Sequence, residues 1–237
     1  MAALTLAPGV FKVASAFPDP PFEVAPDGGF DAALMERICT AIGLRREPVR
    51  FTGEDFDGIF AGLGRDWDAV ISGTTITAPR EKVARFAPPY LTFDQGVAVS
   101  VARHPGIRSV SGLKGMTVGI QRGNTSDIVA RKLLAQGLIA GIRYYPYSAI
   151  GTALNDLAAG GIGAVIKLQP VLTELVKDHA GLRVVCRVPT RERIAIAVAP
   201  GNDALLTAIA AAQAKIMADP WFAATRAAWF GTAGGTP

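Results

Sequence analysis

The stretch that decides the fold is Asp68-Ala-Val-Ile-Ser72-Gly-Thr-Thr75-Ile-Thr-Ala-Pro-Arg80. Its first residues predict a short buried strand, which ends in small and hydroxylated residues followed by a tight turn. Ser72, Thr75 and the backbone amides from Gly73 onward can supply hydrogen-bond donors at this turn. Arg80 can then bind a carboxylate through two parallel hydrogen bonds. Spacing alone leaves a second interpretation open, in which Arg80 is a solvated side chain of a surface turn.

Strands and helices alternate on the N-terminal side of this stretch. The pattern predicts a buried strand at Phe11–Ala16, a helix from Asp31, as its cap, to Ile42, a strand at Val49–Phe51 and an amphipathic helix over residues 56–63. Alternation with this spacing favours a parallel sheet with helices on both faces.

A second alternating series follows residues 86–101, where paired prolines and an extended run predict no helix. The predicted strands are Thr117–Ile120, Ile142–Tyr147, Ala164–Ile166, Val184–Val188 and Ile194–Val198. The predicted helices are Thr125–Ala135, Ala149–Ala159, Val171–Lys177, Asp203–Met217 and Trp221–Phe230. The tail Gly231–Pro237 is predicted to be mobile.

Two α/β units of similar layout therefore lie in series. The sequence predicts an α/β protein of two Rossmann-like lobes with mixed, mostly parallel sheets, joined by two extended crossings that act as a hinge. Residues 1–95 and 197–237 are expected to form lobe 1, and residues 96–196 lobe 2. Ligands of open parallel sheets sit beyond the carboxyl ends of the strands, so a ligand cleft is expected between the lobes.

Two further features can contribute to a binding site. The segment Gly119 to Ser126, with Asn124 and Thr125, follows a strand and opens a helix, where backbone amides attract an anion. An ordinary helix N-cap is the alternative. Phe56, like other aromatic residues beside the turns, can wall a cleft, although most aromatic side chains belong to the core.

Composition and charge exclude several classes of protein. The chain has 237 residues and a formal charge of +4, with no long run of one sign, so nucleic-acid binding is not expected. Apolar runs are too short for a membrane-spanning helix. Residues 1–11 lack the features of a signal peptide, so we expect either a cytoplasmic protein or the mature part of an exported one. No metal-ligand spacing or nucleotide motif occurs, so no cofactor is expected, and the cysteines Cys39 and Cys186 are expected to be buried free thiols.

Taken in order, these motifs resemble the family 3 extracellular solute-binding proteins, which are the polar amino-acid binding components of ABC importers. The resemblance covers residues 11–231. It rests on Phe30-Asp31, Glu54-Asp-Phe56-Asp-Gly-Ile, Asp68-Ala-Val-Ile-Ser72, Thr75-Ile-Thr-Ala-Pro-Arg80-Glu, Phe86-Ala-Pro-Pro-Tyr90, Leu113-Lys-Gly-Met-Thr-Val-Gly119, Gly123-Asn-Thr125 and Asp156-Leu-Ala-Ala-Gly160.

The resemblance implies a type II periplasmic binding protein fold and a set of roles. Arg80 would bind the ligand carboxylate, and Thr75 with the Ser72–Gly73 segment would donate hydrogen bonds from lobe 1. Thr125 would hold the same carboxylate from lobe 2, and Phe56 would contact the body of the ligand.

The sequence departs from the family at two positions. Leu168 stands where the family usually has an acid that binds the α-amine of the ligand, and a leucine cannot pair with an ammonium group. Asp19 stands where the family usually has a cleft aromatic residue. Asp19 can replace the missing acid, or no amine is bound and Lys167 meets a second anionic group.

The resemblance implies a monomeric periplasmic or extracytoplasmic binder, not an enzyme, whose partners are a small carboxylate ligand and an ABC permease. Two other functions stay open on this fold. One is an enzyme that resembles cyclohexadienyl (arogenate or prephenate) dehydratases, with Lys167 or Asp19 as the acid. The other is the ligand-sensing domain of a receptor.

Overall fold

A computed structural model describes residues 4–231 of the chain, so the predicted mobile tail lies mostly outside the described residues. The chain folds into two compact units. Unit 1 comprises the described residues up to Thr52, Asp57–Thr92 and those from Glu192 onward, and unit 2 comprises Gly53–Phe56 and Phe93–Arg191. Each unit contains its own sheet and its own helices.

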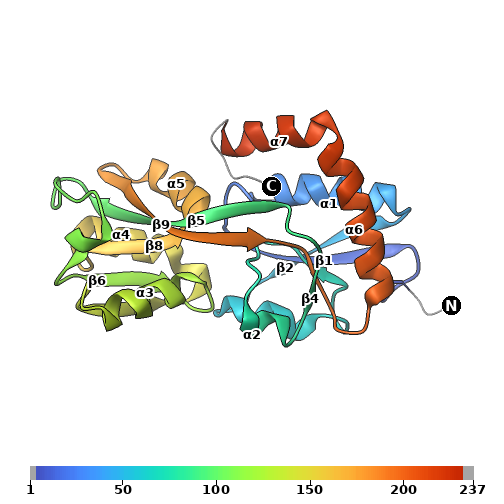
Figure 1. Cartoon of the computed structure of the whole chain (residues 1–237), viewed down its shortest axis with the longest axis horizontal. Helices are drawn as coiled ribbons and strands as arrows, with labels where there is room; N and C mark the ends of the chain where they lie inside the picture. Colours follow the sequence, from blue (N-terminus) through green and yellow to red (C-terminus); the bar gives the residue numbers. More distant parts are fainter. Residues whose placement is uncertain (1–3, 232–237) are drawn as a thin grey trace. The chain divides into compact units, whose positions relative to one another are not determined.

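The sheet of unit 1 has five strands in the order β2-β1-β3-β10-β4. Strand β1 runs parallel to β2 and β3, whereas β10 is antiparallel to β3 and β4. Helices α1, α6 and α7 pack against one another (Figure 1). The elements are β1 (Val10–Ala16), α1 (Phe30–Ala41), β2 (Arg45–Phe51), η1 (Phe56–Gly62), β3 (Ala69–Val70), α2 (Ala78–Glu81), β4 (Arg85–Phe86), β10 (Ala197–Val198), α6 (Asp203–Ala218) and α7 (Pro220–Phe230).

Helix α1 begins at Phe30, directly after a glycine, and the predicted cap does not cap it. Gly29 precedes the helix with a φ of 109°, and no side chain bonds to the first turn as a cap. The predicted capping role of Asp31 is therefore wrong. Asp31 lies one residue inside the helix, where it is fully buried, and its carboxylate accepts hydrogen bonds from other elements.

Two elements of unit 1 differ from the predicted ones. Strand β2 begins four residues earlier than predicted, because Arg45 to Pro48 pair with Val10 to Val13 in register. A strand at the edge of a sheet keeps one side in water, which accommodates these polar side chains. The predicted amphipathic helix over residues 56–63 is the 3-10 helix η1.

The sheet of unit 2 also has five strands, in the order β7-β6-β8-β5-β9. Strand β6 runs parallel to β7 and β8, and β5 is antiparallel to β8. The main segment of unit 2, Phe93–Arg191, begins within β5 and ends within β9. The elements are β5 (Leu91–Ser100), η2 (Val110–Leu113), β6 (Thr117–Gln121), α3 (Ser126–Ala135), β7 (Gly141–Tyr145), η3 (Tyr147–Ala149), α4 (Ile150–Ala159), β8 (Ala164–Leu168), α5 (Gln169–Leu175), η4 (Val176–Asp178) and β9 (Leu182–Ile194).

Successive residues of β5 belong to different cores, which shows how the sheet of unit 2 is covered on both faces. Val97 and Val99 belong to a cluster that contains Val129 of α3, whereas Ala98 belongs to a cluster that contains Leu154 of α4. Side chains of a strand alternate between the faces of the sheet, so α3 and α4 lie on opposite faces. The predicted α/β fold with mixed sheets is confirmed.

The bounds of strand β9 and the burial of one cysteine differ from the predictions. The strand predicted at Val184–Val188 is longer and covers Leu182–Ile194, whereas the strand predicted at Ile194–Val198 is the separate, shorter β10 (Ala197–Val198). Both cysteines are free, as predicted, but only Cys39 is fully buried, while Cys186 is half-buried.

Candidate functional site

Arg80 is a buried side chain of unit 1. The residue is 5% exposed, which rules out the solvated surface turn. Its Nε donates to Asp57 Oδ1 at 2.9 Å, and its Nη1 donates to the carbonyl oxygen of Thr75 at 2.9 Å. The guanidinium carbon also lies 5.3 Å from the ring centroid of Phe60. These contacts hold the plane of the guanidinium in one orientation, which is what bidentate recognition of a carboxylate requires.

The local sequence explains where Arg80 is placed. Pro79 lies in the first turn of α2, where its missing N–H costs nothing. Thr77 caps the helix, because its hydroxyl accepts from the backbone N–H of Arg80 at 3.4 Å. The short helix therefore follows directly on the Ser72–Thr75 turn and brings Arg80 back to the carbonyl of Thr75.

The polar groups of the Ser72–Thr75 turn bond within unit 1. The Ser72 hydroxyl accepts from the Ala16 amide at 3.0 Å, and the Gly73 amide donates to Asp31 Oδ2 at 2.7 Å. The Thr75 hydroxyl donates to Glu192 Oε2 at 2.6 Å. These bonds tie the end of β3 to the end of β1, to α1 and to β9. The turn has a defined shape before any ligand arrives.

A cluster of buried carboxyl groups lies behind this turn. Asp19, Glu23 and Asp31 are 7%, 2% and 0% exposed. Burial raises the pKa of Asp31 to about 7, although hydrogen bonds from the Gly73 amide and from the Tyr90 hydroxyl lower it. Burial is also the main cause that raises the pKa of Glu23 well above its ordinary value, and the charge of Asp31 adds to it. Asp19 therefore lies in an acidic environment, where a neighbouring cation is favoured.

Two predicted residues of unit 2, Lys167 and Asn124, contact Gln121, which lies at the carboxyl end of β6. Gln121 Oε1 accepts from Lys167 Nζ at 2.6 Å and from Asn124 Nδ2 at 3.0 Å, and Gln121 Nε2 donates to the carbonyl oxygen of Tyr147. Lys167, at the end of β8, is 3% exposed, and its Nζ lies 5.4 Å from the ring centroid of Tyr147. The neighbouring Leu168 is also buried.

Thr125 and Phe56 lie in the same unit. Thr125 precedes α3 but does not cap it with its side chain. Its hydroxyl instead accepts from Gln95 Nε2 at 3.1 Å. The ring of Phe56 is buried, and its centroid lies 5.3 Å from that of Tyr147. Unit 2 thus presents a buried cation, side-chain amides and two aromatic rings at one end of its sheet.

Several residues that make these contacts were not predicted from the sequence. In unit 1 they are Asp57 and Glu192, and in unit 2 they are Gln95, Gln121 and Tyr147. Asp57 had a signal, since it lies in the Glu54–Ile59 motif. Gln121 also had one, since it lies within the Gly119–Ser126 segment. For Glu192, Gln95 and Tyr147 no sequence motif indicates the contact, because each residue lies far along the chain from its partner.

Metal clusters and membrane-spanning helices are both absent from the described part of the chain. Residues 4–231 contain no group of three His, Cys, Asp or Glu side chains placed to hold a metal ion. Within the same residues, the helices are too short or too polar to cross a membrane.

Comparison with known proteins gives one family and several close structures. The model of the bacterial extracellular solute-binding proteins, family 3, matches residues 11–232. The chain is 30% identical over 208 residues to ABC transporter arginine-binding protein 1 of Escherichia coli (strain K12), and the alignment covers 85% of this chain and 81% of the relative.

Two solved structures extend the likeness to nearly the whole chain. An ancestral arginine-binding protein bound to arginine matches with a TM-score of 0.83 and 30% identity, covering 94% of this chain and 99% of its own. An ancestral amino acid-binding protein, described as a precursor of cyclohexadienyl dehydratase, matches with a TM-score of 0.81 and 27% identity, covering 94% and 95%.

Proposed function

Because this chain belongs to the bacterial extracellular solute-binding proteins, family 3, we propose that it captures a small carboxylate ligand, an amino acid or a related organic acid, for an ABC importer. In this proposal the protein acts as a monomer outside the cytoplasm, and its membrane partner is the permease. The observation that carries the proposal is the oriented, buried guanidinium of Arg80, held by Asp57 and by the Thr75 carbonyl. A buried guanidinium with a planar fork of donors is suited to a carboxylate.

The ligand contacts are proposed to come from both units. From unit 1 we propose Arg80 and the Ser72–Thr75 turn with Gly73. From unit 2 we propose Thr125, Asn124, Phe56 and Lys167, with Gln121 holding the lysine in place. The resemblance to the family supports these positions, as do the hydrogen bonds of Arg80 to the Thr75 carbonyl and of Lys167 to Gln121.

Three residues, Leu168, Lys167 and Asp19, bear on the second polar group of the ligand. Leu168 is buried and apolar where the family has an acid, and Lys167 is a buried cation next to it. A ligand ammonium beside a buried cation is disfavoured. Asp19, in the acidic cluster of unit 1, supplies the opposite charge. We propose that a ligand with an α-amine uses Asp19, and that a ligand with a second carboxylate uses Lys167.

A thermal-shift screen over amino acids, dicarboxylates and aromatic acids tests the proposal. A ligand at about 100 times its Kd adds roughly 2.7 kcal/mol of stability, which corresponds to a rise in Tm of roughly 5–10 °C for a chain of this size. Arg80→Ala is expected to abolish the shift of every hit. The matched control is Arg65→Ala, because Arg65 is an exposed arginine of the same unit, paired with Asp66.

A second variant, Arg80→Lys, separates loss of folding from loss of carboxylate recognition. It keeps the positive charge of the buried side chain but loses the planar fork of hydrogen-bond donors. We expect this variant to fold, as checked by circular dichroism, and to bind each hit at least about tenfold more weakly. A hit that binds Arg80→Lys or Arg80→Ala as tightly as the wild type would show that Arg80 is not the carboxylate anchor.

An enzyme on the same fold is the second candidate function, and the likeness to a precursor of cyclohexadienyl dehydratase favours it. Such an enzyme would use Arg80 for the substrate carboxylate and Lys167 or Asp19 as the acid for the leaving group. The Escherichia coli relative and the two ancestral proteins are themselves named as binding proteins. Incubation of prephenate and arogenate with a high concentration of the protein decides the matter, since unchanged substrates exclude the enzyme.

A further inference from the structure

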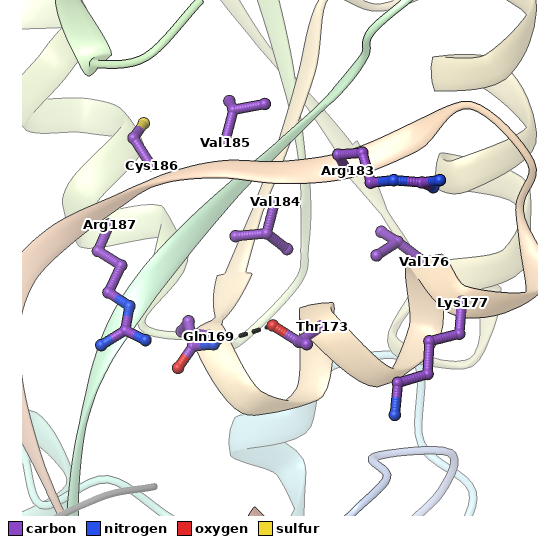
Figure 2. Close-up of a pocket in the computed structure, with 9 residues that line it drawn as sticks. All are labelled: Gln169, Thr173, Val176, Lys177, Arg183, Val184, Val185, Cys186 and Arg187. Atoms are coloured by element: carbon purple, nitrogen blue, oxygen red, sulfur yellow. Dashed lines mark hydrogen bonds between the residues drawn. The ribbon is translucent and has the colours of Figure 1, made fainter. Parts of the chain in front are cut away.

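A groove lies between β9 and α5, within unit 2 and apart from the residues proposed above (Figure 2). Its volume is about 650 Å³, which is within the range of pockets that bind ligands. Its lining residues come from one side of α5 and η4 and from the first half of β9: Gln169, Thr173, Val176, Lys177, Arg183, Val184, Val185, Cys186 and Arg187.

Valine side chains make the centre of the groove apolar. Figure 2 shows Val184 between Arg183 and Arg187 along β9, on the side that faces α5. Val176 and Val184 pack against the hydrophobic core on the α4 side of the sheet. Gln169 and Thr173 line the α5 side, where Gln169 Nε2 donates to the Thr173 hydroxyl at 2.9 Å. An occupant therefore meets an apolar centre with one polar pair beside it.

Basic side chains surround this apolar centre. Arg183, Arg187 and Lys177 all line the groove, and Arg183 and Arg187 are exposed. Lys177 pairs with Glu174, which is not a lining residue. The lining contains no Asp or Glu. The groove therefore has a net positive charge, and its complement is an occupant that carries carboxylates.

The strand that forms one wall of the groove is an edge strand. β9 is the last strand of the described sheet of unit 2, with β5 as its neighbour on the other side. An edge strand presents backbone N–H and C=O groups that a further strand can pair with. Recognition by strand addition takes its affinity from these backbone groups and its specificity from the side chains that flank them.

We propose that the β9–α5 groove binds an acidic, extended peptide segment of a partner protein, which pairs with β9 along Arg183–Arg187. A peptide that carries both acidic and apolar residues fits best, because acidic side chains can meet Arg183 and Arg187 while apolar side chains meet Val184 and Val176. The proposal does not depend on the proposed ligand or on Arg80, so either proposal can fail without the other.

The probe is a fluorescein-labelled peptide of alternating glutamate and valine, titrated with the full chain and followed by fluorescence anisotropy. We expect binding with a Kd below about 1 mM that weakens as salt is added. The double variant Arg183→Glu, Arg187→Glu is expected to weaken binding at least about tenfold. Hydrogen exchange of the wild-type complex is expected to show new protection of the amides over residues 183–187.

Two controls separate a specific groove from general attraction between charges. Arg45→Glu reverses an exposed charge on β2, the edge strand of the other unit, and should leave the affinity unchanged. A lysine–valine peptide should not bind. Basic side chains on an edge strand can also serve only to block unwanted pairing. In that case the acidic peptide fails to bind at about 1 mM. Three results would each overturn the proposal. They are failure of the acidic peptide to bind, an equal loss of affinity in Arg45→Glu and in the double variant, and no new protection of the amides at residues 183–187.

Discussion

Replacing Asp31 with asparagine tests whether the buried carboxyl cluster lowers the stability of the protein as pH rises. Asp31 is fully buried beside Glu23, and burial raises its pKa to about 7. In the unfolded chain an aspartate ionises near pH 4. Between these two values the folded protein keeps a proton that the unfolded chain has lost. The free energy of unfolding therefore falls as pH rises through this window.

The size of the effect follows from the separation of the two pKa values. Each retained proton changes the free energy of unfolding by about 1.4 kcal/mol per pH unit. Over the window from pH 4 to 7 the contribution of Asp31 is then on the order of 4 kcal/mol. It is fully present below the unfolded pKa and is lost as pH rises through the folded pKa. The raised pKa of Glu23 acts in the same direction.

Urea unfolding at a series of pH values from about 4.5 to 8 measures the effect for the wild type and for Asp31→Asn. The amide oxygen of asparagine can still accept from the Gly73 amide, and asparagine does not ionise. The free energy of unfolding of the variant minus that of the wild type should therefore increase with pH up to about 7 and then level off.

Glu36→Gln is the matched control, because Glu36 lies on the same helix with a side chain that is 65% exposed. Its pH profile should follow that of the wild type closely. The reasoning is refuted if the difference between Asp31→Asn and the wild type is the same at pH 5 and pH 7, or if it decreases between them.

Two further predictions concern the unit 2 site and the start of α1. Lys167→Met should weaken binding of a ligand with a second carboxylate by at least about tenfold, and should leave α-amino acids bound as well or better, as measured by calorimetry. If both classes weaken equally, Lys167 has no part in selectivity. Gly29→Ala should destabilise the protein by more than about 2 kcal/mol, because an added Cβ would lie 2.0 Å from the carbonyl oxygen of Phe22. Gly9→Ala also changes a glycine with positive φ, but nothing lies within 4 Å, so urea unfolding should give a loss nearer 1 kcal/mol. Similar losses in both would mean that the contact with Phe22 is not decisive.

Much of the fold was predictable, because apolar periodicity is local. Strand β1 and helices α3 and α4 lie within a residue or two of the predicted ranges. The elements that escaped prediction depend on neighbours. The start of β2 is polar and becomes a strand only because β1 pairs with it. The middle of β9 is equally polar. There the backbone N–H of Gln95 donates to the Thr190 hydroxyl, and the backbone N–H of Arg191 donates to Asp94 Oδ1.

The sequence by itself determined the alternating α/β pattern, the turn after β3 and the presence of Arg80 just beyond it. These depend on residues close together in the chain, so a linear pattern records them. Only the tertiary structure decided what surrounds that arginine and that turn. Asp31 resembles a helix cap in sequence, but its partners Gly73 and Tyr90 are 42 and 59 positions away. The burial that raises its pKa is likewise a property of packing, because distant side chains remove the water that would solvate its charge.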